Sequence, residues 1–193
     1  TQWALDRFRG HYRDESISRD DLFHYVYAVL HHSAYREHYA TNLRRDLPRV
    51  PLAPDFWSFA HAGRRLVEVQ LAYEDQPEYS LRLVEVPGEK LDWRVSRMRL
   101  TRDRQGVAYN HFLTLAGIPP ETLEYKIGNR SALEWVIDQY QVSTDKRSGI
   151  TNDPNRPDDP RYIVRLIGQV VTVSLETMKI VKGLPALDQG KGS

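Results

Sequence analysis

The 193-residue chain contains no cysteine. This absence excludes disulfide bonds, thiolate zinc sites and cysteine nucleophiles, and it favours a reducing compartment. The chain also has no apolar run near the roughly 20 residues that a membrane-spanning helix needs. Its first residues, TQWALDRFRG, do not have the layout of a signal peptide. We therefore predict a cytoplasmic protein with no membrane partner.

A large net charge is missing as well, because 27 Lys and Arg residues are balanced by 26 Asp and Glu residues. Attraction to a nucleic acid would have to come from local clusters of basic residues. The sequence has no G-x-x-x-x-G-K-[ST] or G-x-G-x-x-G phosphate-binding loop and no G-x-S-x-G nucleophile motif. We predict no catalytic residue and no bound cofactor in this chain.

Helical periodicity dominates the first third of the chain. Apolar residues recur at three- and four-residue spacing after Ser18 and predict a helix. Ser33 is predicted to cap a second helix, and Asp55 to start a third after prolines 48, 51 and 54. The second helix would carry an aromatic and apolar face and a basic carboxyl end, formed by Tyr35, Tyr39, Leu43, Arg44 and Arg45.

The middle of the chain changes to a period of two. LRLVEV (81–86) and WRVSRMRLT (93–101) alternate apolar and charged residues, and DRQG (103–106) has the composition of a turn. We predict a mostly antiparallel sheet here. The alternation brings five arginines together with only Asp103 to offset them, which gives a local charge of five minus one, or +4. These arginines are Arg94, Arg97, Arg99, Arg102 and Arg104.

Helical patterns return in the last third. GIPPE (117–121) predicts a turn leading into a short helix, and Ser131 with Glu134 forms the S-x-x-E capping box of an amphipathic helix. A polar loop follows over residues 143–161, and residues 162–181 predict a final helix, although VVTVSLE alone would also suit a strand. We predict an α+β fold with an N-terminal helical layer, a central mostly antiparallel sheet and C-terminal helices.

Two polar segments flank the capped helix and are candidates for contact with nucleic acid. Gly128-Asn129-Arg130 places backbone donors, an amide and a guanidinium ahead of a helix N-terminus, where phosphates bind. The later loop combines basic and amide side chains, which can contact phosphates and base edges. Its residues are Lys146, Arg147, Asn152, Asn155 and Arg156. Alternatively, Asn152 and Asp153 form Asx turns before Pro154.

Two other chemistries have weak support. His24, His31, His32 and His38 could suggest a metal site, but on one helix their spacing points them apart, so we predict solvated or capping histidines. Glu124-Tyr125-Lys126 has the E-x-K form found in magnesium-dependent nucleases, with Asp92 or Asp103 as the further acid. Such short strings are common in charged proteins, so a surface ion pair is the favoured explanation.

Three stretches together resemble a known family. They are YVYAVLHHSAYREHYATNLRRDLPRVPL, GIPPETLEYKIGNRSALEWVIDQYQVSTDKRSGITNDPN and YIVRLIGQVVTVSLETMKIV. The chain resembles, from about residue 15 to 185, the C-terminal specificity region of type ISP restriction-modification enzymes, which are single polypeptides with a nuclease, a helicase-like ATPase motor and an adenine-N6 methyltransferase. The first residue, Thr1 rather than Met, agrees with a part of a larger polypeptide.

The resemblance implies a module that recognises double-stranded DNA and works with the methyltransferase and helicase domains of the same polypeptide. S-adenosylmethionine, ATP and magnesium would bind elsewhere in that polypeptide. Residues 1–54 would join the methyltransferase part, residues 55–185 would form the target-recognition domain, and residues 186–193 would be a disordered tail. Motif residues Asn129, Arg130 and Asn152 would serve as framework or phosphate contacts. The hairpin from Arg97 to Arg104 and the loop from Lys146 to Arg156 are the candidates for base recognition. The main alternative is a coupling module that docks the helicase and methyltransferase parts.

Overall fold

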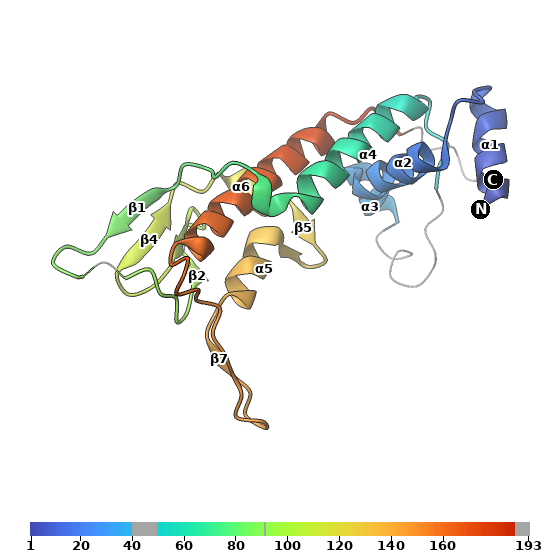
Figure 1. The fold of residues 1–193 in the computed structure, drawn as a ribbon. Coiled ribbons are helices and arrows are strands. Elements are labelled where there is room, and N and C mark those ends of the chain that lie inside the picture. The colour runs from blue at the N-terminus through green and yellow to red at the C-terminus, as the bar shows by residue number, and fades with distance from the viewer. Residues whose placement is uncertain (40–49, 91, 188–193) are drawn as a thin grey trace. The chain divides into compact units, whose positions relative to one another are not determined.

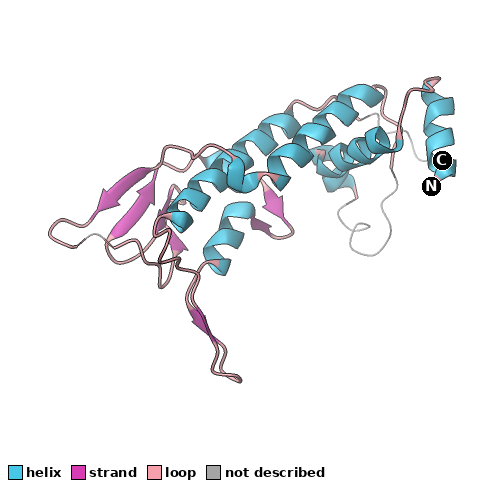
Figure 2. Ribbon diagram, in the orientation of Figure 1, coloured by secondary structure: helices cyan, strands magenta, loops and turns pink. Residues whose placement is uncertain are grey.

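The computed structural model describes residues 1–39, 50–90 and 92–187. The chain divides into two compact units, whose helices and strands are drawn in Figures 1 and 2. Unit 1 comprises Thr1–Leu71 and Lys179–Ser193, and unit 2 comprises Ala72–Met178. Helices and antiparallel strands are both present, so the predicted α+β class is confirmed. These structural units do not test the predicted division of roles between residues 1–54 and residues 55–185, which stays a prediction.

Unit 1 is helical. Its elements before the unit boundary are α1 (Gln2–Tyr12), α2 (Arg19–His31), α3 (Ser33–His38) and α4 (Phe56–Leu71). The helix predicted after Ser18 is confirmed, because the Ser18 side chain accepts a hydrogen bond from the Asp21 amide in a capping box. Asp55 likewise accepts a hydrogen bond from the Ser58 amide at the start of α4, as predicted.

Two details of the N-terminal prediction are corrected. Ser33 is the first helical residue of α3 and His32 is the N-cap, so Ser33 does not cap this helix. His24 is buried, so it is not a solvated histidine, whereas His31 has Nδ1 2.8 Å from the Tyr27 carbonyl oxygen in the last turn of α2 and His38 is exposed, as predicted for capping or solvated histidines. The predicted helical residues Leu43, Arg44 and Arg45 lie outside the described residues.

Aromatic rings fill the core of unit 1. Tyr25 is fully buried and stacks on Phe56 with ring centroids 5.0 Å apart. Its hydroxyl donates to the Pro51 carbonyl and accepts from the Ala53 amide, each at 2.7 Å. The Tyr25 hydroxyl thus provides hydrogen-bond partners for the Pro51 carbonyl and the Ala53 amide, which would otherwise be buried without one. Helices α2 and α4 pack closely beside this cluster at Gly63.

Unit 2 is built on a four-stranded antiparallel sheet with the order β1-β4-β3-β2. The strands are β1 (Arg82–Glu85), β2 (Arg99–Leu100), β3 (Gly106–Ala108) and β4 (Leu113–Ala116). The predicted turn at DRQG joins β2 to β3 and is confirmed, with Thr101 donating to the Gly106 carbonyl. Strand β4, one of the two inner strands, lies in a segment whose pattern does not predict a strand.

Most of the predicted strand 93–101 is not a strand, and only Arg99–Leu100 pairs in the sheet. Side chains from the β3–β4 region bind the backbone of residues 92–94 instead. The Tyr109 hydroxyl donates to the Trp93 carbonyl at 2.8 Å, and the Asn110 amide donates to the carbonyls of Asp92 and Arg94. Acceptors that a neighbouring strand would use are therefore already occupied.

The core of unit 2 lies between its sheet and two helices, α5 (Ala132–Gln139) and α6 (Tyr162–Lys182). Leu115, Leu133 and Ile167 are fully buried in it. The final helix predicted from residue 162 is confirmed, because the whole VVTVSLE stretch lies within α6. The short helix predicted after GIPPE is the 3-10 helix η3 (Pro120–Leu123). No helix among the described residues has the length and apolarity required to cross a membrane.

The capping box of α5 predicts a pH-dependent stability. Glu134 accepts a hydrogen bond from the Ser131 amide at 2.9 Å, and this bond, together with the Ser131 hydroxyl and Arg104, lowers the carboxyl pKa below its ordinary value of 4.5. A carboxylate with a lowered folded-state pKa contributes its full stability above the unfolded pKa and loses it as the pH falls through the folded pKa.

We expect Glu134→Gln to lower the free energy of unfolding by about 0.5 to 1 kcal/mol at pH 7, since glutamine keeps the capping geometry but loses the charge. Chemical unfolding at stepwise lower pH should show this difference shrinking below pH 4.5, the ordinary pKa. A difference that does not shrink as the pH is lowered below 4.5 would contradict the electrostatic explanation.

Candidate nucleic-acid interface

The polar loop predicted over residues 143–161 contains a hairpin. Its strands β7 (Ser143–Thr144) and β8 (Thr151–Asn152) pair antiparallel, with Ser143 opposite Asn152 and Thr144 opposite Thr151. We call residues 143–152 the ribbon. In Figure 1 the ribbon extends away from the rest of unit 2. All ten of its residues are exposed, so nothing in unit 2 covers it.

The tip of the ribbon is an ordered turn. The Asp145 carboxylate accepts hydrogen bonds from the amides of Arg147 and Ser148 and from the Ser148 hydroxyl. These hydrogen bonds, of which those from Ser148 have the largest effect, lower the pKa of the Asp145 carboxyl. Gly149 adopts the left-handed conformation that closes the turn, with φ of 71°. The side chains of Lys146 and Arg147 make no ion pair with any described residue, so the tip presents two free cations.

The base of the ribbon is tied to residues 94–96. The Val142 amide donates to the Ser96 carbonyl at 3.1 Å. On the other strand, the Asn155 side chain accepts from the Val95 amide and donates to the Val95 carbonyl, each at 2.8 Å. Arg94 and Asp153 form an ion pair at 2.7 Å beside them. Bonds to both strands therefore fix where the ribbon leaves the body of unit 2.

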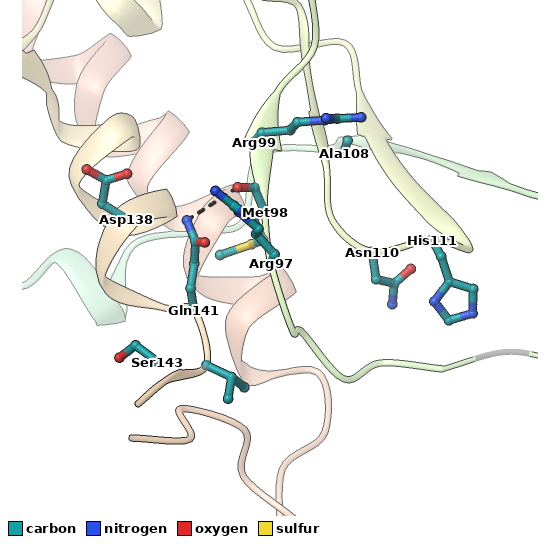
Figure 3. A pocket seen from close by; sticks show the side chains of 10 residues that line it. Arg97, Met98, Arg99, Ala108, Asn110, His111, Asp138, Gln141 and Ser143 are labelled. Atoms are coloured by element: carbon teal, nitrogen blue, oxygen red, sulfur yellow. Dashed lines mark hydrogen bonds between the residues drawn. The ribbon is translucent and has the colours of Figure 1, made fainter. Parts of the chain in front are cut away.

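A hollow of about 950 Å³ lies next to this base (Figure 3). Arg97 and Arg99 stand on its β2 side, and Asp138, Gln141 and Ser143 stand on its α5 side. The hollow is lined by Arg97, Met98, Arg99, Ala108, Asn110, His111, Asp138, Gln141, Val142 and Ser143. Because Ser143 is also the first residue of β7, the hollow continues directly onto the ribbon.

Carboxylates neutralise part of the predicted arginine cluster. Arg104 pairs with Glu134 at 2.9 Å, and Arg94 pairs with Asp153. Surface ion pairs of this kind contribute little stability but do reduce the charge available to a ligand. The remaining members of the cluster, which pair with no carboxylate among the described residues, are Arg97, Arg99 and Arg102.

The predicted residues are only partly brought together. Arg97, Arg99 and the ribbon share one surface around the hollow. Asn129 and Arg130 lie instead at the other end of α5, in the hairpin of β5 (Lys126–Ile127) and β6 (Arg130–Ser131). The Arg130 side chain nevertheless reaches the edge of the hollow, because it forms an ion pair with Asp138, one of the lining residues. It also lies over the Trp135 ring, and the ion pair reduces the charge that it offers to a ligand.

Two other predicted residues have structural contacts inside unit 2. Asn155 holds the ribbon base, as described above, and the Arg156 guanidinium lies 3.3 Å from the centroid of the Tyr162 ring. Their assignment as DNA contacts remains a prediction. For Asn155 it would require the bonds to Val95 to break, whereas the exposed Arg156 guanidinium can stack on Tyr162 and still offer its N–H groups to a phosphate. Sequence reasoning did not single out Gln141 or Ser143, which line the hollow. Ser143 had a weak signal from its position in the long polar loop, whereas Gln141 had none.

The residues considered for a metal site or a nuclease site do not gather into a metal-binding cluster in the part of the chain that the structure describes. Among residues 1–39, 50–90 and 92–187 there is no group of three or more His, Asp or Glu side chains placed to hold a metal ion. Asp103, one of the acids considered for a nuclease site, accepts hydrogen bonds from the Thr101 hydroxyl and the Gln105 amide within the β2–β3 turn. It stabilises the turn that joins the two strands.

Comparison with known proteins gives one family and several similar structures. Residues 1–166 match the family model of the type ISP C-terminal specificity domain. A nuclease-deletion mutant of the type ISP restriction-modification enzyme LlaGI, in complex with a DNA substrate mimic, is 43% identical over 89% of this chain and 17% of its own length, with a TM-score of 0.80.

Two further structures are similarly related. The ATP-dependent type ISP restriction-modification enzyme LlaBIII bound to DNA is 32% identical over 97% of this chain and 12% of its own, with a TM-score of 0.85. The DrdV–DNA complex is 39% identical over 96% of this chain and 20% of its own, with a TM-score of 0.84. A comparison with curated proteins finds no match.

This chain thus spans at most 20% of the length of these three proteins. The family model covers most of the chain. The three structures have the same fold as this chain over 89 to 97% of its length. The sequence resemblance to type ISP enzymes is confirmed. The chain therefore belongs to the family of type ISP C-terminal specificity domains.

Proposed function

We propose that this chain recognises a specific sequence in double-stranded DNA. Its family is that of the specificity domains, and the three similar structures are named as complexes with DNA or a DNA mimic. The observation that carries the proposal is the continuous surface of the hollow and the ribbon. It combines unpaired cations with exposed amide and hydroxyl groups, the side chains that contact phosphates and base edges.

The cations of this surface are suited to phosphate contact. Arg97 and Arg99 lie at the hollow and Lys146 and Arg147 at the ribbon tip, each without an ion pair among the described residues. Because the whole chain has a formal net charge of only +1, this local concentration has to supply the electrostatic attraction. Arg102, in the turn between β2 and β3, is the further unpaired arginine proposed to contact DNA.

The proposed role within a longer polypeptide follows from the relatives. The chain would hold target DNA while a methyltransferase site elsewhere in the polypeptide receives an adenine, which must leave the base stack to be methylated. Other parts would cleave DNA and bind S-adenosylmethionine, ATP and magnesium. Residues 1–54 are proposed to join the methyltransferase part and residues 55–185 to form the recognition domain, and all of this would take place in the cytoplasm.

Titration of duplex DNA at several salt concentrations tests the proposal. The full polypeptide that carries this chain should bind duplex DNA with a strong salt dependence, and Lys146→Ala/Arg147→Ala should reduce the slope of log K against log salt by about two. The matched control is Arg36→Ala/Arg65→Ala, which removes two exposed helical arginines of unit 1 and should leave the slope unchanged. Equal slopes for the two double variants would refute the assignment of the ribbon.

Exposed aromatic residues on unit 1 favour a second role, that of an inter-domain coupling module. Trp3 is 69% exposed on α1 and Phe23 is 56% exposed on α2, and large apolar side chains left in solvent are typical of docking surfaces. A purely coupling role predicts that Trp3→Ala/Phe23→Ala weakens ATP-dependent cleavage by the full polypeptide while its DNA affinity is unchanged. The two roles are compatible, since they use different units.

A further inference from the structure

The three asparagines of the candidate set differ in whether their amides are free. Asn155 uses both its oxygen and its nitrogen to bind Val95. Asn129 is exposed in the β5–β6 turn, away from the hollow. Asn152 is exposed on β8, and its side chain makes no hydrogen bond to any residue that the structure describes, although its backbone pairs with Ser143 in the ladder. The backbone of Asn152 is therefore held in place by strand pairing, while its side-chain amide makes no hydrogen bond within the described residues.

The register of the ribbon determines which way this amide faces. Directly opposed residues in an antiparallel pair lie on the same face, and neighbours along a strand alternate between faces. Asn152 thus shares a face with Ser143, which lines the hollow together with Arg97 and Arg99. Thr144 and Thr151 share the opposite face, where their hydroxyls bond each other at 2.9 Å. The Ser143/Asn152 face of the ribbon adjoins the hollow. On the opposite face, the two threonine hydroxyls already form a hydrogen bond with each other.

The free face has the chemistry of base recognition. An asparagine amide offers a donor and an acceptor side by side, which match the N7 acceptor and N6 donor of adenine in the major groove. A serine hydroxyl can contact any base edge, and an arginine matches guanine. Two strands about 4.8 Å apart form a ribbon that enters a major groove about 12 Å wide.

The ribbon is also held in one conformation before it meets a ligand. Its tip is closed by the hydrogen bonds to Asp145, and its base is tied to Val95 and Ser96. Ordering a flexible loop on binding would reduce affinity, so an arm with both ends fixed loses less free energy on association. A fixed backbone also holds a side chain at one base pair, which sequence discrimination requires.

We propose that the Ser143/Asn152 face of the ribbon reads base edges in the major groove, with Asn152 bound to an adenine, while Lys146 and Arg147 contact phosphates. This assignment rests on the proposed function and adds to it the element and the residue that determine specificity. It differs from the sequence-based expectation that Asn152 is a framework or phosphate contact. That expectation did not distinguish the backbone of Asn152, which is structural, from its side chain.

Selection from a pool of randomised DNA duplexes tests the assignment. The full polypeptide should enrich a defined sequence, and Asn152→Ala should relax one adenine position of it, with discrimination at that position falling about tenfold or more. Asn152→Asp should shift the same position towards cytosine, because a carboxylate accepts from the cytosine N4 amino group. The matched control Thr151→Ala alters the opposite face of the same strand and should leave the enriched sequence unchanged.

The outcomes separate this assignment from the proposed function. If the unaltered polypeptide enriches no sequence, both are wrong. If it enriches a sequence that Asn152→Ala and Asn152→Asp leave unchanged, base reading by the ribbon is overturned while DNA recognition stands. Loss of all duplex binding at low salt by Asn152→Ala would also overturn it, since removing a base contact leaves the phosphate contacts in place. Asn152 is exposed, so circular dichroism should show all three variants folded.

Discussion

Replacing Gly63 with alanine should lower the free energy of unfolding by about 3 kcal/mol. A Cβ atom at this position would lie 1.8 Å from the His24 carbonyl oxygen and 2.6 Å from its carbonyl carbon. Both atoms belong to the backbone of α2, so no side-chain rotation relieves the overlap. Helix α4 would have to move away from α2, and the packing of Phe59 and Ala60 against the aromatic core would loosen.

Native-state hydrogen exchange measures this effect unit by unit. Gly63→Ala should reduce the protection of amides in α2 and α4, while amides of the central strand β4 in unit 2 keep theirs. Gly10→Ala provides the matched control, because Gly10 also lies in a helix but a Cβ there meets no atom within 4 Å. That control should stabilise the protein by about 0.5 to 1 kcal/mol through helix propensity. Equal protection in the two variants would show that α2 and α4 are not in close contact.

Asn155→Ala should cost about 2 to 3 kcal/mol of folding free energy, as two backbone groups would lose their partner. Val95 is 1% exposed, and its amide and carbonyl bond only the Asn155 side chain among the described residues. Burying a backbone donor and an acceptor without hydrogen bonds is unfavourable. The ribbon would also lose one of the ties at its base, so its position relative to the hollow would become less defined.

Chemical unfolding and hydrogen exchange together check this prediction. Asn155→Ala should lower the unfolding midpoint and increase the exchange of the Val95 amide and of the ribbon amides. Asn129→Ala is the matched control, since Asn129 is an exposed turn residue and its loss should change stability by less than about 0.5 kcal/mol. If Asn155→Ala is as stable as the control and still weakens DNA binding, Asn155 is a direct DNA contact, as its sequence context predicts.

Local signals in the sequence were sufficient for most of the helices, although α1 was not predicted. The capping box of Ser131 and Glu134, the cap at Ser18 and the apolar stripe of residues 162–181 each depend on residues within a few positions of one another. The same holds for the DRQG turn between β2 and β3. Helix and turn formation follows from short-range spacing, so these elements could be predicted without knowledge of what they pack against.

The sheet and the ribbon depended on partners far away in the chain. Residues 93–98 alternate like a strand, yet the Tyr109 hydroxyl and the Asn155 amide bind their backbone and leave no ladder to form. In the ribbon strands, Ser143 and Asn152 favour turns whereas Thr144 and Thr151 favour strands, so the local signal is mixed and the pairing of the two strands decides the extended conformation. The charge available to a ligand also depends on distant partners, because Glu134, 30 residues away in the sequence, neutralises Arg104.

The sequence by itself determined most of the helices, the family resemblance and the set of basic and amide residues from which a DNA-binding surface could be built. Tertiary structure alone decided which of them share a surface. It placed Arg97 and Arg99 at the hollow with Ser143, left the Asn152 side chain without a hydrogen-bond partner among the described residues, and used the Asn155 side chain to bind the Val95 backbone. The physical reason is that a side chain is available to a ligand only when no distant part of the fold already satisfies its charge or its hydrogen bonds.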